Sequence, residues 1–163
     1  MKHYFVIFLF AFGLSTFGSA QVAQKPNAAE RPLTEEDQIR FLVLSDLLGK
    51  ESREKKTRCV TVDGEKKKPS KALLERLKQV DPKVKSGSRC YLDKQDGDVV
   101  VDGVTGKEAL LFSVNKLKRL DRDRVELSGS NYEANMASFG CKYTLVRENG
   151  IWKIETVSDC YIS

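Results

Sequence analysis

The sequence predicts an α+β domain in which an N-terminal helix and a small disulfide-linked helical lobe pack on a curved antiparallel sheet. Three observations predict this class. A helical apolar pattern covers residues 34–48, a series of strand-like runs follows from residue 99, and four cysteines lie beyond residue 20. Helices that precede a run of consecutive strands are typical of α+β domains rather than of parallel α/β domains.

The first twenty residues have the three parts of a secretory signal peptide. Lys2 supplies a positive start, residues 4–17 are almost all apolar, and small residues at 18–20 precede a cut before Gln21. The apolar run is shorter than the roughly 20 residues that a membrane-spanning helix needs. We therefore expect cleavage after Ala20, a secreted or periplasmic protein, and no transmembrane segment once the signal peptide is removed.

Cleavage leaves about 143 residues with a net charge of about +4 and no histidine, since His3 lies in the signal peptide. Residues 21–33 contain prolines and no apolar period, which predicts a flexible tether before a single domain at 34–163. A mature chain without imidazole has no Ser-His-Asp or Cys-His mechanism and no His-ligated metal site. We expect no metal and no cofactor.

The first helix is predicted from Thr34, an N-cap followed by three acidic residues, to about Leu48, with Gly49 as its stop. Its apolar face is broad and requires a large partner surface, such as a concave sheet. That face contains Ile39, Phe41, Leu42, Val43, Leu44, Leu47 and Leu48.

The next segment predicts a small lobe. Residues 59–62 read as a short strand, residues 69–82 as a helix that Ser70 opens and Asp81 closes, and residues 88–92 as a second short strand. Cys59 and Cys90 therefore lie on two strands that flank the same helix.

From residue 99 the pattern predicts an antiparallel meander. Its strands cover residues 99–101, 108–117, 124–128 and 132–147, followed by the last strand after residue 150. In the second strand, Leu110, Phe112 and Val114 face one side. The Ser-Gly-Ser-Asn run at 128–131 is interpreted as a turn, and Gly140 as the bend of the long strand.

Asn149-Gly150 is the strongest local signal, because Asn-Gly between alternating runs is the preferred type I′ hairpin turn. The hairpin register pairs Glu148 with Ile151, Arg147 with Trp152, Leu145 with Ile154, and Tyr143 with Thr156. It places Cys141 opposite Ser158, with Cys160 two residues further along the same face, where twist or a bulge at Gly140 would bring the sulfurs together.

An even number of cysteines in an exported chain indicates two disulfides, with three connectivities to choose from. The spacings contain no Cys-x-x-Cys pair, which argues against a metal site. We predict Cys59–Cys90 within the lobe and Cys141–Cys160 across the last hairpin. The rival pairings would link the lobe to the hairpin end.

The run from Tyr143 to Ile154, with its Gly150-x-Trp152-Lys-Ile ending, resembles the last hairpin of cystatin-like α+β domains, including the nuclear-transport-factor-2-like variety. The segments around Cys59, residues 69–70 and 88–90, and the ending at 161–163 are similar to a group of exported bacterial proteins whose function is not established. The resemblance implies a cystatin-like fold and carries over no catalytic residue. The Gln-Val-x-Ala-Gly-type loop of cystatin-like protease inhibitors has no match in this domain.

The carboxylates of the predicted sheet argue against acid–base catalysis. Glu126, Glu133 and Glu155 alternate with apolar neighbours, so they are expected to point to water without the burial or charged partner that tunes a pKa. Asp63 and Asp102 each precede a glycine and are interpreted as turn residues.

Four polar residues on apolar strand faces are candidates for lining a cleft. They are Ser113, Asn115, Tyr143 and Thr156. As a site they would be polar anchors among apolar walls, whereas the simpler interpretation makes them satisfied core or sheet-end residues.

The leading hypothesis is a non-enzymatic exported domain that binds a protein or small-molecule partner with its sheet face or its helix–sheet cleft. The alternative is a small-molecule enzyme or ligand carrier that uses the same cleft. An open cavity above about 300 Å³ with an inward carboxylate would favour the alternative, and a packed core would contradict it. Lys and Arg form four clusters (50–58, 66–68, 83–89, 116–124), but acids interleave them and no aromatic series is present to stack bases, so we expect no nucleic-acid partner.

Overall fold

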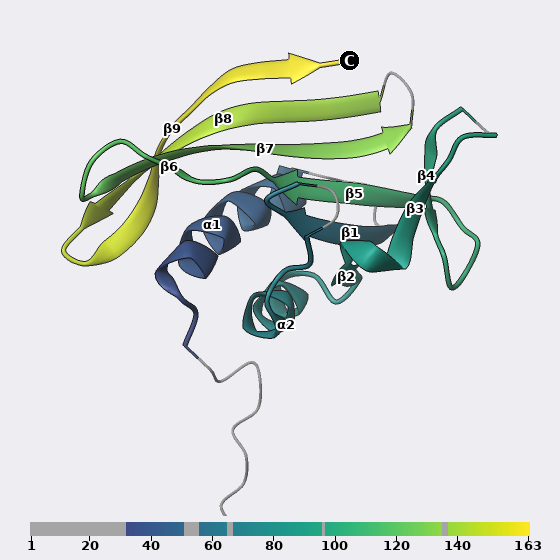
Figure 1. Ribbon diagram of the computed structural model, residues 1–163, viewed down its shortest axis with the longest axis horizontal. Helices are drawn as coiled ribbons and strands as arrows, with labels where there is room; N and C mark the ends of the chain where they lie inside the picture. Colours follow the sequence, from purple (N-terminus) through teal and green to yellow (C-terminus); the bar gives the residue numbers. More distant parts are fainter. Residues whose placement is uncertain (1–31, 51–55, 65–66, 96, 135–136) are drawn as a thin grey trace, which may run out of the picture.

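The computed structural model describes residues 32–50, 56–64, 67–95, 97–134 and 137–163. The expected signal peptide, its cleavage after Ala20 and the expected tether up to residue 31 lie outside these ranges. The described chain is α+β, with two helices on one face of a mixed seven-stranded sheet and a small separate hairpin at one end (Figure 1).

The helices are α1 (Glu35–Lys50) and α2 (Lys71–Val80), with a 3-10 turn, η1, at Gly87–Arg89. The strands are β1 (Thr57–Val62), β2 (Val84–Ser86), β3 (Cys90–Asp93), β4 (Val99–Asp102), β5 (Ala109–Val114), β6 (Lys118–Arg119), β7 (Arg124–Ala134), β8 (Ala137–Glu148) and β9 (Ile151–Ile162). The large sheet has the order β2-β1-β5-β7-β8-β9, with β6 paired to β7, while β3 and β4 pair only with each other.

Helix α1 begins as predicted. The backbone N–H of Asp37 donates to the Thr34 hydroxyl at 3.2 Å, so Thr34 caps the first turn. Ile39, Val43 and Leu47 are completely buried in the core that α1 forms with the sheet. The helix extends past the predicted stop and ends at Lys50, so Gly49 lies inside it.

Helix α2 is capped at both ends by the predicted residues. The Ser70 hydroxyl accepts from the Leu73 N–H at 3.1 Å, and the Asp81 N–H donates to the Leu77 carbonyl. Leu73 and Leu77 are completely buried, and α2 packs against α1 and β2.

The sheet is mixed, which corrects the expectation of an antiparallel sheet. β1 is parallel to both of its neighbours, β2 and β5, and α2 connects β1 to β2 as a crossover helix. β1 is buried from its second residue onward, as parallel strands covered on both faces are. The predicted first strand of the meander, β4, leaves the sheet and pairs with β3. From β5 to β9 the order is antiparallel as predicted.

The predicted turn at 128–131 is wrong, because β7 runs through it without a break. A Cβ at Gly129 would lie 2.7 Å from Val43 Cγ1 and 2.9 Å from Leu47 Cδ1. This glycine therefore allows the close approach of α1 to the sheet rather than a reversal of the chain. The continuous strand also places residue 133 on the same face as Val125 and Leu127.

The last hairpin has the predicted turn, with Asn149 and Gly150 both at positive φ (51° and 80°). The first three predicted register pairs are confirmed, but Tyr143 pairs with Val157 rather than with Thr156. The cause is a bulge that adds one residue to β9 between Ile154 and Thr156.

Both disulfides form in the expected pairing. Cys59 and Cys90 have their Cα atoms 6.2 Å apart, and those of Cys141 and Cys160 are 4.1 Å apart. A second register shift, between Gly140 and Lys142, adds another residue to β9. In a ladder without bulges, Cys141 would lie opposite Ser158. The two extra residues of β9 bring Cys160 opposite Cys141 instead.

Candidate functional site

The inner face of the sheet, which α1 covers, is packed. Tyr143 of β8 is completely buried there, and its hydroxyl donates to Asp46 of α1 at 2.8 Å. Burial raises the pKa of Tyr143, and the hydrogen bond to Asp46 raises it further. The phenol therefore stays protonated at neutral pH. Tyr143 is thus a core residue that joins β8 to α1.

The helix–sheet space opens beyond the C-terminal end of α1, in a hollow of about 280 Å³ that Lys50, Glu133 and Phe139 help to line. Glu133 is mostly buried and forms an ion pair with Lys56, which also binds Glu108 at 2.6 Å. The expectation that Glu133 points to water without a charged partner is therefore wrong. Its strand parity was misassigned because a turn was placed inside β7. Glu155 and Glu126 also have charged partners, Arg124 and Lys118.

A larger hollow, of about 460 Å³, lies against the outer face of the sheet, opposite the helices; we call it the outer groove. It extends from the β3–β4 hairpin across β5, β7 and β8 to the edge strand β9. Its lining consists of Leu92, Lys94, Asp98, Leu111, Ser113, Ser130, Asn131, Tyr132, Ser138 and Tyr161.

The floor of the outer groove is one row of cross-strand neighbours. Ser113 of β5 lies opposite Ser130 of β7, Ser130 opposite Gly140 of β8, and Gly140 opposite Tyr161 of β9. The two serine hydroxyls are hydrogen-bonded at 3.0 Å. Because three adjacent strands carry small residues here, the surface is hollow between taller side chains on either side.

Two tyrosines shape the ends of the outer groove. The ring of Tyr161 lies over Gly140, where a Cβ would come within 2.6 Å of it, and the residue remains 54% exposed. The hydroxyl of Tyr132 donates to the carbonyl of Asp98 at 3.1 Å and so holds the β3–β4 turn against the sheet. The groove therefore has an exposed aromatic ring at one end and an anchored hairpin at the other.

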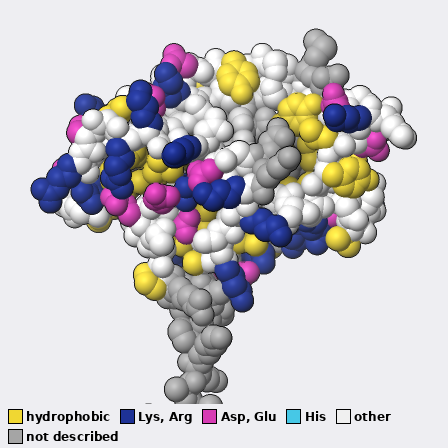
Figure 2. Space-filling model, viewed as in Figure 1, with side chains coloured by type: hydrophobic (Ala, Val, Ile, Leu, Met, Phe, Trp, Pro, Cys, Tyr) yellow, Lys and Arg dark blue, Asp and Glu magenta, His cyan; other side chains and the backbone are white. Residues whose placement is uncertain are grey.

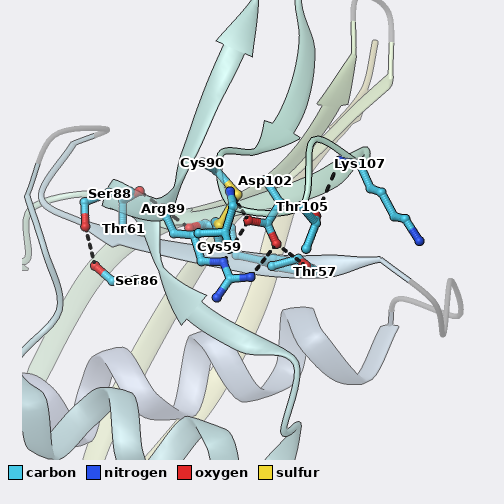
Figure 3. Close-up of a disulfide and its surroundings, with 12 residues drawn as sticks. Thr57, Cys59, Thr61, Ser86, Ser88, Arg89, Cys90, Asp102, Thr105 and Lys107 are labelled. Carbon is cyan, nitrogen blue, oxygen red and sulfur yellow. Dashed lines mark hydrogen bonds and ion pairs between the residues drawn. A yellow bond between two sulfur atoms is a disulfide. The ribbon is translucent and has the colours of Figure 1, made fainter.

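The base of the β3–β4 hairpin is fixed beside the Cys59–Cys90 disulfide (Figure 3). Asp102 is completely buried, and Arg89 donates to its two carboxylate oxygens at 2.8 and 2.9 Å. The Thr57 hydroxyl donates to the same carboxylate at 2.9 Å, which ties the hairpin to β1. The hydrogen bond from Arg89 outweighs the burial and lowers the pKa of Asp102 far below its ordinary range.

Asp102 is therefore more than the turn residue that the sequence predicts. Asp63 has the positive φ (52°) expected of a turn, and it also accepts from Arg40 at 2.9 Å and from Lys67 at 2.6 Å. Although burial opposes it, these two cations lower the pKa of Asp63. Sequence reasoning missed both clusters because the arginines, Arg40 and Arg89, lie 23 and 13 residues from their carboxylates and no periodicity links them.

The structure does not bring the four candidate cleft residues together. Ser113 lines the outer groove, Asn115 and Thr156 are exposed, and Tyr143 is buried on the inner face. The groove residues that were not anticipated are Ser130, Tyr132 and Tyr161, the last with its ring over Gly140. The signal that identifies Ser130 and Tyr132 is the register of β5 with β7, which places them opposite Ser113 and Leu111 and which the misplaced turn concealed.

Basic residues are interspersed with acidic ones on the face shown in Figure 2. Each of the four predicted basic clusters supplies an ion pair: Arg58 with Asp81, Lys67 with Asp63, Arg89 with Asp102, and Arg124 with Glu155. Within the described ranges, no helix is long and apolar enough to cross a bilayer, and no group of three or more His, Cys, Asp or Glu residues is placed to hold a metal ion.

The chain matches no protein-family model, no curated protein and no solved structure. Its function must therefore be inferred from its own residues.

Proposed function

We propose that this chain is an exported, non-enzymatic binding domain of cystatin-like layout that takes a partner or small ligand in the outer groove. The observation that carries the proposal is a hollow of about 460 Å³, which is within the usual size range of ligand sites, on a face that neither helix covers. The cystatin-like layout is supported by α1, which packs on the antiparallel strands β5 to β9. The strand β1 departs from an all-antiparallel sheet, because it is parallel to β5.

Export is supported by the two disulfides, which indicate an oxidising compartment. We expect the intact mass of protein recovered from an oxidising compartment to begin at Gln21, with all four cysteines oxidised. Non-reducing peptide mapping should yield the Cys59–Cys90 and Cys141–Cys160 peptides. A mass that retains residues 1–20, or a peptide linking Cys59 to Cys141 or Cys160, would contradict this assignment.

The lining of the outer groove favours binding over catalysis. Its serine hydroxyls, Ser113 and Ser130, are hydrogen-bonded to each other rather than to a base that would activate them. The charged residues of its described lining, Lys94 and Asp98, belong to the β3–β4 turn at one end. The hollow beyond α1 supports the enzyme alternative less well, because it holds about 280 Å³ and its carboxylate, Glu133, is ion-paired with Lys56.

A fragment screen observed by ¹⁵N NMR tests the proposal. We expect bound fragments to shift the amide signals of Ser113, Ser130 and Tyr161, and these shifts to disappear in Ser130→Leu, which fills the floor of the groove. The matched control is Ser128→Leu, two residues away on the same strand and exposed. Fragments that shift only residues around the C-terminal end of α1, or no shifts at millimolar concentrations, would refute the assignment.

A further inference from the structure

We infer that the ligand of the outer groove is a neutral oligosaccharide, one ring of which packs on the exposed face of Tyr161; this inference rests on the proposed function. The inference comes from three properties of the groove: the hydrogen-bonding groups of its floor, its balance of charge, and the position of one aromatic ring.

The floor presents hydroxyl groups. Each serine hydroxyl donates one hydrogen bond and accepts two, and the bond between Ser113 and Ser130 uses a single donor. One hydroxyl donor and several lone pairs therefore remain for a ligand, with the Tyr161 phenol close by in the same row. A ligand that matches such a surface must both donate and accept at closely spaced positions, as the hydroxyls of a sugar do.

The charge in the groove is balanced. Among the described residues of its lining, Lys94 and Asp98 carry charge, one of each sign and both on the hairpin turn. Sites for phosphate or carboxylate ligands instead concentrate arginine side chains or backbone N–H groups, which form strong charge-assisted hydrogen bonds. This lining therefore favours an uncharged ligand over an anionic one.

Tyr161 provides a flat apolar surface at the mouth of the groove. Its ring rests over Gly140, and the residue is 54% exposed, which leaves ring surface accessible to a ligand. The C–H groups on one face of a pyranose ring pack against such a surface by dispersion and weak C–H···π attraction, while the ring hydroxyls reach the neighbouring polar groups. Gly140 is required for this arrangement, because any Cβ there would displace the tyrosine ring.

An extended peptide added to the free edge of β9 is less well supported. Two bulges interrupt β9, and Lys153, Glu155 and Asp159 place charges along the edge. Bulges and charges are the features by which edge strands prevent further strand pairing.

Titration of the oxidised protein with N,N′-diacetylchitobiose, cellotriose and maltotriose, followed by NMR and calorimetry, tests the inference. We expect at least one of these uncharged oligosaccharides to shift the amides of the groove floor. Tyr161→Ala should then weaken its binding about tenfold, while Tyr161→Phe, which keeps the ring, should bind within about threefold of wild type. Gly140→Ala should weaken binding with little loss of stability, because the Cβ displaces only the end of a flexible side chain.

Tyr91→Ala is the matched control, since Tyr91 is 53% exposed on β3 and does not line the groove. Fragment binding in the groove without binding of any of the three saccharides would refute the ligand class and leave the proposed function intact. Saccharide binding that survives Tyr161→Ala would refute the role of the ring. An extended peptide that shifts the amides of β9 instead would assign the partner to the sheet edge and overturn the inference.

Discussion

Replacing Gly129 by valine is expected to lower the free energy of unfolding by about 2–3 kcal/mol. A Cβ at this position would already lie 2.7 Å from Val43 and 2.9 Å from Leu47, and it would come within 3.3 Å of the Tyr143 ring. Val43 and Leu47 both lie in the middle of α1. The helix must therefore move away from the sheet to make room for the valine side chain. Urea denaturation followed by circular dichroism measures the loss.

The control for this substitution is Ser128→Val. Ser128 is the preceding residue of the same strand, and its exposed side chain lies on the face of the sheet opposite to α1. Because valine is favoured in strands, we expect the control to keep wild-type stability to within about 0.5 kcal/mol. Equal losses in the two variants would show that β7 does not have the register described.

Replacing Asp102 by asparagine is expected to cost about 1.5–3 kcal/mol, the usual range for hydrogen bonds to charged groups, because Arg89 is itself partly exposed. The carboxylate is completely buried and accepts from Arg89, Thr57 and the Val104 N–H. Its loss should loosen the β3–β4 hairpin first, which hydrogen exchange at the amides of β3 and β4 will detect. The control is Asp121→Asn, at an exposed loop position, with little expected change.

The same substitution should change how stability depends on pH. Because folding lowers the pKa of Asp102 below its ordinary value of 3.8, the ionised group contributes its stabilisation above that pH. The contribution is lost as the pH falls below this value toward the folded-state pKa. The gap in stability between wild type and Asp102→Asn should therefore be widest at neutral pH and narrow in acid. A gap that stays constant would show that the carboxylate is not ionised in the folded state.

Local signals in the sequence predicted the elements whose causes are local. The Thr34 and Ser70 caps, the apolar stripe of α1 and the Asn149-Gly150 turn depend on residues within a few positions of one another, and the structure has all of them. Cysteine number and strand placement likewise predicted both disulfide pairs.

Local signals failed where a residue serves a distant partner. Gly129 lies in a Ser-Gly-Ser-Asn run that is typical of turns, yet α1 needs its small size. Asp102 precedes a glycine as turn residues do, yet its carboxylate binds Arg89. Gly129 therefore has a turn-like context without a turn, whereas Asp102 opens the predicted turn, accepting from the Val104 N–H, and also holds a distant partner that only long-range packing supplies.

The sequence by itself therefore determined the α+β class, the helix caps, the last hairpin and the cysteine pairing, because each follows from short-range periodicity, turn chemistry or strand adjacency. Only the tertiary structure decided that β1 is parallel to its neighbours and that β3 and β4 stand apart from the sheet. It also decided that Ser113, Ser130, Gly140 and Tyr161 form one row. A groove floor is built across strands, and its members meet through register, which depends on bulges and on helix packing that no local pattern encodes.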